Sequence, residues 1–198
     1  MPFAAARRPT IGTVIAAVIF LGAGSALAAA EPAPQRVVSI NLCTDQMAIL
    51  MAEPGQLKSV SFLATEKGTS MMVDEAAHYR LNHGQAEEVF LMQPDLVLAG
   101  TYTAKATVGL LKELGFRVEQ FTPATSFEDV RKSLIRMGSL LHREQRAAEL
   151  VAELDQGLAE LAARKVPHKN AAFYYANSYT SGSGTLADAI VKAAGLTN

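Results

Sequence analysis

The chain has 198 residues, a formal net charge of −1 and 19% charged residues, and 49% of its residues are hydrophobic. This composition is typical of a globular protein and excludes an intrinsically disordered one. The balanced charge offers no broad basic surface, so we expect no nucleic-acid partner. A single cysteine, Cys43, excludes an internal disulfide and a metal cluster made of cysteines alone.

Residues 1–28 have the three-part layout of a secretory signal peptide. Arg7 and Arg8 form a positive start, residues 11–21 are apolar and uncharged, and residues 26–28 place small side chains at a cleavage site. The apolar run is shorter than the roughly 20 residues that a membrane-spanning helix needs. Cys43 lies well beyond the expected cleavage site. We therefore expect a cleaved, periplasmic protein that is not a lipoprotein.

Residues 29–125 alternate predicted strands and helices. The predicted strands are residues 37–40, 59–62, 96–99 and 116–119, and the predicted helices are residues 42–52, 86–92 and 104–114. Residues 64–83 are polar and irregular, with one helical turn near residues 74–77. This alternation predicts an α/β fold, a Rossmann-like N-terminal lobe with a parallel sheet. The run 96–99 is apolar throughout, as expected of a parallel strand that is covered on both faces.

Residues 126–165 are predicted to form one long linking helix. Ser126 and Asp129 fit the start of a capping box, and an apolar stripe continues to Leu161 without a proline. Gly138 and Gly157 lie inside this segment and are expected to cost about 1 kcal/mol each. The predicted helix is long enough to leave one lobe and reach a second.

Residues 166–198 are predicted to begin a second α/β lobe. Residues 171–175 read as a strand, residues 178–185 as a polar, glycine-rich loop, and residues 185–194 as a helix. A lone strand and helix cannot form a lobe, because a stable sheet needs three or more strands or solid packing. We therefore expect this lobe to be incomplete and the chain to be truncated within it.

Ligands of open parallel sheets bind at the loops beyond the carboxyl ends of the strands. In this chain the expected ligand contacts in those loops are Asn41, Leu42, Cys43, Phe62, Leu63, Thr101 and Tyr102. Tyr102 offers a flat apolar face and a polar tip, which suit a macrocycle or an aromatic chelator. Core packing is the alternative for Phe62 and Leu63, and burial as a small hydrophobic residue is the alternative for Cys43.

Four features of the chain together resemble one protein family. They are the export signal, the strand Arg36-Val37-Val38-Ser39-Ile40, Glu87 seven residues before the run Pro94-Asp95-Leu96-Val97-Leu98-Ala99, and the long linking helix. Thr180-Ser181-Gly182, after the last predicted strand, also fits. The chain resembles, over residues 36 to about 196, the periplasmic substrate-binding proteins for vitamin B12, iron-siderophores and haem that serve ABC importers. The resemblance implies two α/β lobes, a stiff helix between them, and a ligand in the cleft. It implies no catalytic residues and no resident cofactor, although the ligand can itself be a metal complex.

The resemblance also implies roles for three further residues. Glu87 would be the acid of the first lobe that docks onto arginines of the permease, and the acid of the second lobe would lie beyond Asn198. A carboxylate at a helix start is favoured by the helix dipole and can accept both nitrogens of an arginine. His83 would contact the ligand or bind the iron of haem, and Tyr179 would face the first lobe across the cleft. A solvated helix start is the alternative for Glu87, and a surface position is the alternative for His83.

The resemblance thus implies a monomer whose partners are a permease of the inner membrane and a corrinoid or small metal chelate. Two other functions stay open. His78, His83, Glu87 and Asp95 could bind a free zinc or manganese ion, although a zinc site needs three or four converging ligands. Residues 182–187 spell G-x-G-x-x-A, the dinucleotide fingerprint of an enzyme, but six residues, 176–181, separate it from the predicted strand. We expect neither an enzyme nor a protein-held metal site.

Overall fold

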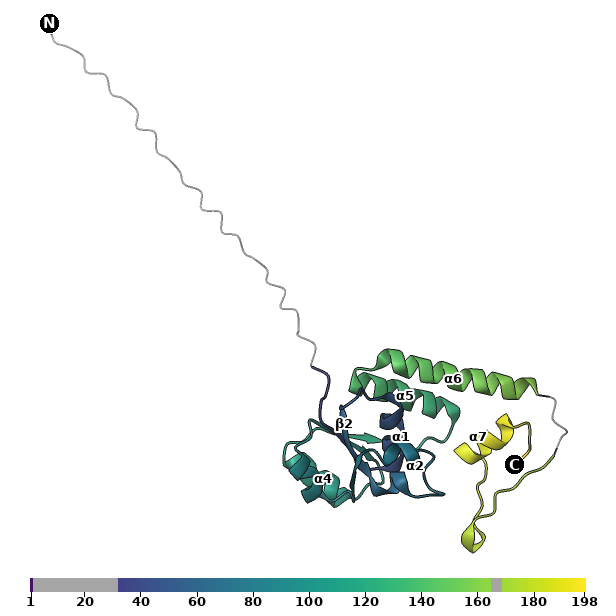
Figure 1. Ribbon diagram of the computed structural model, residues 1–198. Coiled ribbons are helices and arrows are strands. Elements are labelled where there is room, and N and C mark those ends of the chain that lie inside the picture. Colours follow the sequence, from purple (N-terminus) through teal and green to yellow (C-terminus); the bar gives the residue numbers. More distant parts are fainter. Residues whose placement is uncertain (2–31, 165–168) are drawn as a thin grey trace. The chain divides into compact units, whose positions relative to one another are not determined.

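The computed structural model describes Met1, residues 32–164 and residues 169–198 (Figure 1). The predicted signal peptide therefore lies, apart from Met1, outside the described residues. Within the described ranges, no helix is both long enough and apolar enough to cross a membrane. The predicted boundaries between lobes stay predictions.

A parallel sheet of five strands organises residues 37–121. The strands are β1 (Val37–Ser39), β2 (Leu57–Ser61), β3 (Arg80–Asn82), β4 (Leu96–Gly100) and β5 (Val118–Phe121). Their order across the sheet is β3-β2-β1-β4-β5. The chain thus builds outward from β1 to β3, returns to pair β4 with β1, and continues outward to β5. The predicted α/β fold with a parallel sheet is confirmed.

Helices cover both faces of this sheet. They include α1 (Leu42–Met51), α2 (Val73–Ala76), α3 (Ala86–Met92) and α4 (Lys105–Glu113), and a 3-10 turn, η1 (Phe62–Thr65), follows β2. Successive strand residues point to opposite faces. Val37 packs into a cluster with α1 and the helices after β5, whereas Val38 packs into a second cluster with α3 and α4. The all-apolar sequence of β4 follows from this double burial.

The prediction of one continuous helix over residues 126–165 is wrong. Two helices, α5 (Phe127–Leu141) and α6 (Glu144–Ala163), lie side by side instead (Figure 1). His142 adopts a left-handed conformation with φ 56°, and the Arg143 N–H donates to the Gly138 carbonyl at 2.7 Å. This is the hydrogen bond of a Schellman C-cap, made here without a glycine at the left-handed position. Helix α6, the longer of the two, has 20 residues.

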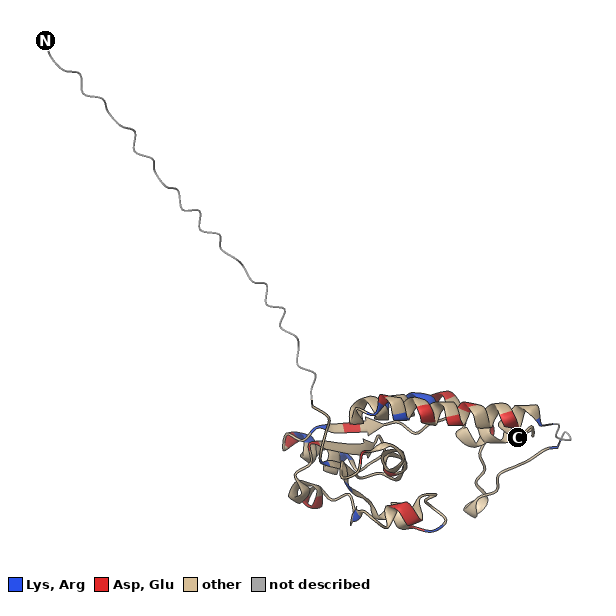
Figure 2. Ribbon diagram, turned by 45° about the horizontal axis from the view of Figure 1, so that its top comes forward, with Lys and Arg blue, Asp and Glu red and all other residues tan. Residues whose placement is uncertain are grey.

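The apolar stripe misled the prediction because both helices bury it in the same core cluster. Met137 and Leu141 of α5 lie in this cluster with Ala147 and Leu150 of α6. The two helices run antiparallel, since the Arg131 guanidinium and the Asp155 carboxylate, 24 residues apart, meet at 2.6 Å. In Figure 2 acidic and basic residues are interspersed along the pair rather than gathered by sign.

Strand β3 and the short α2 fall in the segment that was predicted to be irregular, and only the helical turn there was predicted. Strand β3 is at the sheet edge, and its Arg80 and Leu81 are exposed. A three-residue edge strand has no buried apolar run, so the usual sequence signal of a strand is missing.

The predicted strand over residues 171–175 is not formed in the described C-terminal range. The Ala171 N–H donates to the Thr197 carbonyl and the Tyr175 N–H to the Tyr179 carbonyl, at 2.8 Å each, beside an isolated bridge between Asn170 and Thr197. A 3-10 turn, η2 (Ala176–Ser178), and helix α7 (Leu186–Ala193) follow. Thr185 caps α7 as predicted, accepting from the Asp188 N–H at 3.2 Å. Residues 169–198 contain no neighbouring strand, so the apolar run forms no ladder.

The close approach of α5 and α6 gives a stability prediction. A Cβ on Gly138 would lie 2.5 Å from the Ala147 Cβ and 3.1 Å from the Arg143 carbonyl oxygen, whereas a Cβ on Gly157 would meet nothing. Gly138→Ala is expected to lower the free energy of unfolding by about 1–3 kcal/mol through overpacking. Gly157→Ala, the matched control, is expected to raise it by about 0.5–1 kcal/mol. Urea unfolding of both variants measures this, and a neutral Gly138→Ala would contradict the packing.

Candidate functional site

The turns that follow the strands meet at one edge of the sheet, because all five strands are parallel. From one side of the sheet to the other, this carboxyl edge carries His83, Phe62, Asn41, Thr101 and Thr122, each just after its strand. The order of the strands reverses between β1 and β4, which places the switch point of the sheet at Asn41 and Thr101. We define these turns as the carboxyl-edge site.

Asn41 organises the turn at the switch point. Its side-chain oxygen accepts from the Cys43 N–H at 3.1 Å and so caps helix α1. Its amide group lies against Gly100, where a Cβ would come within 2.7 Å of the Asn41 Nδ2. The absence of a side chain at Gly100 therefore lets Asn41 fill the gap between β1 and β4. The expected contact Asn41 is half-buried, and its capping oxygen is already engaged.

A buried carboxyl group lies beneath this edge. Asp45 of α1 is fully buried and accepts from both the N–H, at 3.1 Å, and the hydroxyl of Ser61, the last residue of β2. Burial raises the pKa of Asp45 to about 6, and hydrogen bonds from Ser39 and Ser61 limit the rise. The carboxyl group thus ties the start of α1 to the end of β2, directly before Phe62.

A buried amide, that of Asn82, ties the end of the outer strand β3 to its neighbours. Asn82 is fully buried, and its Nδ2 donates to the Ser39 carbonyl and to the Ser59 hydroxyl, both at 2.9 Å. Its Oδ1 accepts from the Gly84 N–H at 3.0 Å, so it also fixes the turn that carries His83. Every buried polar side-chain atom in the described part of the chain has a hydrogen-bond partner. The ends of β1, β2 and β3 are therefore held together by side chains.

Two predicted ligand contacts, Phe62 and His83, lie together above these hydrogen-bonded strand ends. Their rings stack with centroids 5.3 Å apart and an angle of 24°. Glu88 holds His83 from the other side: it accepts from the His83 N–H at 2.7 Å and lies 3.1 Å from Nδ1. The hydrogen bond from the His83 backbone is the main reason that the pKa of Glu88 is lowered. The Phe62 ring is 38% exposed and the His83 side chain is 63% exposed.

The other predicted contacts of the first lobe lie along the same edge. Leu42 is half-buried and packs against the core, whereas Leu63 is exposed in η1. Cys43 is exposed, so the alternative of burial as a small hydrophobic residue is wrong. After β4, Thr101 is exposed, and Tyr102 is 87% exposed. The edge thus combines apolar surface with few polar groups, as small-molecule sites do.

Tyr179 and Glu87 lie outside this cluster of turns. Tyr179 is exposed in the loop after η2, where its carbonyl accepts from the Tyr175 N–H at 2.8 Å. Its contact with a ligand stays a prediction. Glu87 is exposed in the first turn of α3, and among the described residues no ion pair or hydrogen bond engages its carboxylate.

Glu87 forms part of an open groove between α3 and α4, with a volume of about 360 Å³. Apart from Glu87 its lining is apolar and consists of Ala86, Phe90, Leu91, Leu110 and Leu114. Four of these side chains, including Phe90 at 43%, are substantially exposed. A carboxylate without a partner thus lies next to exposed apolar surface, on a flank of the sheet rather than at its carboxyl edge.

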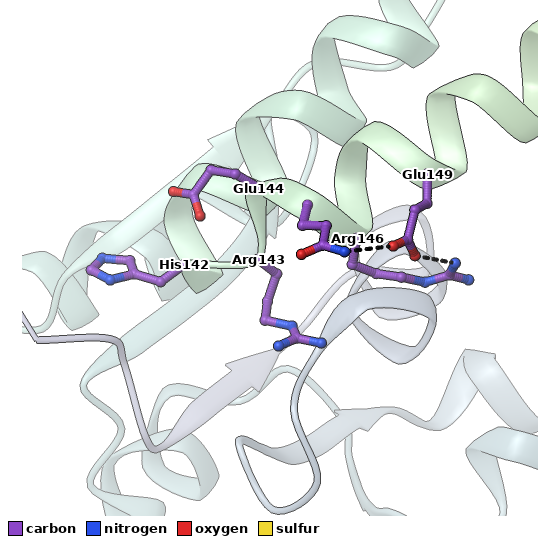
Figure 3. Close-up of a pocket in the computed structure, with 6 residues that line it drawn as sticks. His142, Arg143, Glu144, Arg146 and Glu149 are labelled. Carbon is purple, nitrogen blue, oxygen red and sulfur yellow. Dashed lines mark hydrogen bonds and ion pairs between the residues drawn. The ribbon is translucent and has the colours of Figure 1, made fainter.

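A polar pocket of about 350 Å³ lies at the turn between α5 and α6, lined by His142, Arg143, Glu144, Gln145, Arg146 and Glu149 (Figure 3). The two arginines donate to the carbonyls of Met51 and Leu50, at 3.2 Å each, where α1 ends. Arg143 also pairs with Glu53. These guanidinium groups cap α1 at the opposite edge of the sheet, so the pocket is part of the scaffold.

The structure does not favour the two other functions. Within the described ranges, no group of three or more His, Cys, Asp or Glu side chains could hold a metal ion. The Asp95 carboxylate accepts from the Gln35 and Arg36 N–H groups at 2.7 and 2.9 Å, at the amino end of β4 and far from the carboxyl edge. The G-x-G-x-x-A run starts α7, but no strand precedes it in the described range 169–198, so the strand–turn–helix context of a dinucleotide site is missing.

Four residues that shape the site were not predicted: Asp45, Asn82, Glu88 and Gly100. Gly100 could have been found, since it follows the apolar run 96–99, whereas Asn82 ends β3, whose sequence gives no signal of a strand. Asp45 sits in a helix start, where an acid usually indicates a solvated position. Glu88 was not predicted, because its distance to His83 depends on the fold of the turn between the two residues.

Comparison with known proteins identifies a curated relative of this chain. The chain is 29% identical over 167 residues to a cobalamin-binding protein of Halobacterium salinarum, an alignment that covers 82% of this chain and 45% of that protein. The chain thus spans less than half the length of the curated relative it matches. No protein-family model matches the chain.

Solved structures share the fold at low sequence identity. A possible iron-binding periplasmic protein of Staphylococcus epidermidis superimposes with a TM-score of 0.70 and 19% identity, over 84% of this chain and 67% of that one. For a periplasmic haem-binding protein of Pseudomonas aeruginosa the TM-score is 0.65 and the identity 20%, over 83% of this chain and 62% of that one. For the periplasmic vitamin B12 binding protein of Vibrio cholerae the TM-score is 0.60 and the identity 16%, over 83% of this chain and 66% of that one.

The resemblance that the motifs predicted is therefore confirmed. The fold is that of periplasmic proteins that bind vitamin B12, haem or iron, and the curated relative is a cobalamin-binding protein. These relatives are binding proteins rather than enzymes, in agreement with the expectation from the sequence.

The buried Asp45 gives a pH-dependent prediction. Its pKa is about 6 in the fold and 3.8 in the unfolded chain, so the folded protein binds the proton more tightly. The stability that this proton contributes is present below pH 4 and is lost as the pH rises to about 6, an effect on the order of 3 kcal/mol. Asp45→Asn can accept from the Ser61 N–H and donate to its hydroxyl, but it does not titrate.

Urea unfolding of the wild type and of Asp45→Asn between pH 4 and 7 measures this effect. As the pH rises to about 6, the unfolding free energy of the wild type is expected to fall relative to that of the Asn variant. Above about pH 6 the difference between the two is expected to stay constant. Ionisable groups common to both proteins cancel in this difference. A difference that does not change with pH would contradict the raised pKa.

Proposed function

We propose that the protein is the periplasmic solute-binding component of an ABC importer, and that it captures cobalamin, haem or an iron-siderophore at the carboxyl-edge site. It acts as a monomer after removal of its signal peptide and delivers the ligand to a membrane permease. The relatives support the class of ligand, because those with the same fold bind vitamin B12, haem or iron.

One observation carries the proposal: predicted contacts in the turns after four different strands lie on one edge of the sheet, and two of them are in contact. Phe62 and His83 stack beside the turn of Asn41, and Tyr102 is exposed beyond β4. Exposed aromatic rings above a polar base suit a large ligand with an apolar body and polar rim, because aromatic rings offer a large contact area and few torsions to order. Tyr179 would contribute from the second lobe.

We assign no catalytic role to the polar side chains near this edge. The buried polar side chains near the edge are engaged in holding the turns, as the Asp45 carboxyl group holds Ser61 and the Asn82 amide holds the Gly84 turn. We therefore assign these groups to shaping a binding surface and not to acid–base catalysis.

Delivery is assigned to Glu87 and to the α3–α4 groove. The unengaged carboxylate is suited to a bidentate pair with an arginine, and the adjacent apolar lining is suited to apolar side chains of the same partner. The proposed occupant is a permease segment that carries an arginine beside apolar residues. Because the groove lies on a flank of the sheet, the ligand and the permease would not compete.

The ligand-binding proposal is tested by calorimetric titration of the purified protein with cyanocobalamin, haemin and a ferric siderophore. We expect one of the three to bind, and Phe62→Ala to weaken its binding about tenfold, the effect of losing an aromatic contact worth about 1–1.5 kcal/mol. Phe90→Ala is the matched control, because its ring is similarly exposed but lies in the α3–α4 groove. Binding of none of the three compounds would refute the proposal.

The docking proposal is tested by uptake in cells that depend on this protein for the bound ligand. Glu87→Arg is expected to leave the Kd of the ligand unchanged and to abolish uptake, because it places like charges opposite each other. Glu144→Arg serves as the control, since Glu144 is also exposed in a first helical turn, at the opposite edge. Normal uptake by the Glu87 variant would disprove docking through this carboxylate.

A further inference from the structure

We infer that the carboxyl-edge site includes a subsite for one carboxylate at its β5 end, where Lys132, Thr122 and Ser133 receive an acidic group carried on the rim of the bound chelate. The inference rests on the proposed function and deepens it. It favours metal chelates that have a free carboxylate over those whose rim carries only esters or amides.

The subsite is a pocket of about 310 Å³ between the end of β5 and the amino-terminal half of α5. It lies at the carboxyl edge, because Thr122 directly follows β5. The Thr101 N–H donates to the Phe121 carbonyl at 2.9 Å, so the turn that carries Tyr102 is fixed beside the pocket. A chelate that lies against Tyr102 would therefore bring its rim to this place. The polar part of the lining comes from Thr122, Thr125, Asp129, Lys132, Ser133 and Arg136.

Arg136 forms a wall of the pocket and is already engaged. Its guanidinium donates to the Gln120 carbonyl at 2.6 Å and to the Glu119 carboxylate at 2.7 Å. It also lies 4.4 Å from the centre of the Phe121 ring. These three contacts hold the guanidinium against the outer strand β5. We therefore assign Arg136 to shaping the pocket and to its positive charge, and not to direct contact with the ligand.

Lys132 supplies the cation that is available to a ligand. Its ammonium group is 3.7 Å from the Glu128 carboxylate, one turn earlier on α5, and the two side chains are 69% and 60% exposed. An exposed pair of this kind contributes little, so a ligand can displace it. In the described part of the chain, no hydrogen bond engages the hydroxyls of Thr122 and Ser133. One ammonium and two hydroxyl groups thus offer donors to the same pocket, and a carboxylate can accept from all three.

The charge of the lining suits a group with a single negative charge. Lys132 and Arg136 contribute two positive charges and Asp129 contributes one negative charge, which leaves +1. The Asp129 Oδ2 accepts from the Thr125 N–H at 3.0 Å and from its hydroxyl at 2.9 Å, so this carboxylate fixes the turn before α5. A phosphate monoester carries about 1.5 to 2 negative charges at neutral pH and would be repelled more strongly by Asp129. A carboxylate is the better match.

Lys132→Gln is the most informative variant, because it removes the charge and keeps a polar side chain. Lys132 is exposed, so the change should leave the fold intact. Lys112→Gln is the matched control. Lys112 is also exposed and lies beside the same strand, where its Nζ donates to the Gln120 side chain at 3.3 Å, but it is not part of the pocket. Both variants change the net charge equally, so only a local role distinguishes them.

The experiment compares chelates in pairs whose members differ in a carboxylate. The pairs are haemin and its dimethyl ester, the monocarboxylic acid of cyanocobalamin and cyanocobalamin itself, and a ferric trihydroxamate with a free carboxylate and its methyl ester. Titration followed by absorbance gives the Kd of each member. For the pair that binds, we expect the wild type to bind the acid about three- to tenfold more tightly. Lys132→Gln should remove this preference, whereas Lys112→Gln should keep it.

The outcomes separate this inference from the function on which it rests. Equal Kd values for the two members in the wild type, or a preference that survives in Lys132→Gln, would overturn the subsite and leave the proposed function standing. An equal loss of preference in Lys112→Gln would overturn it too, because the effect would then come from net charge. Tighter binding of the ester or amide would show that the pocket takes a neutral group instead. Failure of all three pairs to bind would overturn the proposed function itself.

Discussion

The site depends on the parallel direction of the five strands and on the reversal of their order between β1 and β4. Parallel strands deliver all of their following turns to one edge, and the reversal separates the turns of Asn41 and Thr101 on the two sides of the switch point. The groups that would contact a ligand come from segments as far apart in sequence as Asn41 and Tyr102. Two apolar clusters, one on each face, hold the sheet in this form.

Side-chain hydrogen bonds convert this topology into a defined surface. Asp45 joins α1 to the end of β2, and Asn82 joins the end of β3 to β1. Both groups are fully buried and engaged, because an unpaired polar group at such depth would cost more than its hydrogen bonds return. Their role is to fix the turns, so the exposed Phe62 and His83 meet in one geometry. The same few buried atoms thus stabilise the fold and shape the proposed binding site.

The sequence was sufficient for features that depend on local pattern and not for those that depend on tertiary contact. The buried β4 and the cap of α7 at Thr185 were predicted because period and capping chemistry are local. The break at His142 was missed because its left-handed C-cap carries no glycine. The pairing of Phe62 with His83, and the clamp by Glu88, require the edge strand β3, whose short polar sequence gives no strand signal.

The central claim is that the ligand binds at the carboxyl edge of this sheet. Hydrogen–deuterium exchange with and without the chelate that binds tests it most directly, because it locates the contact along the chain. The account predicts slower exchange at residues 41–44, 62–65, 83–85 and 100–103, and no change at the α5–α6 turn around Arg143. Protection confined to that turn or to the α3–α4 groove, with the carboxyl edge unaffected, would contradict it.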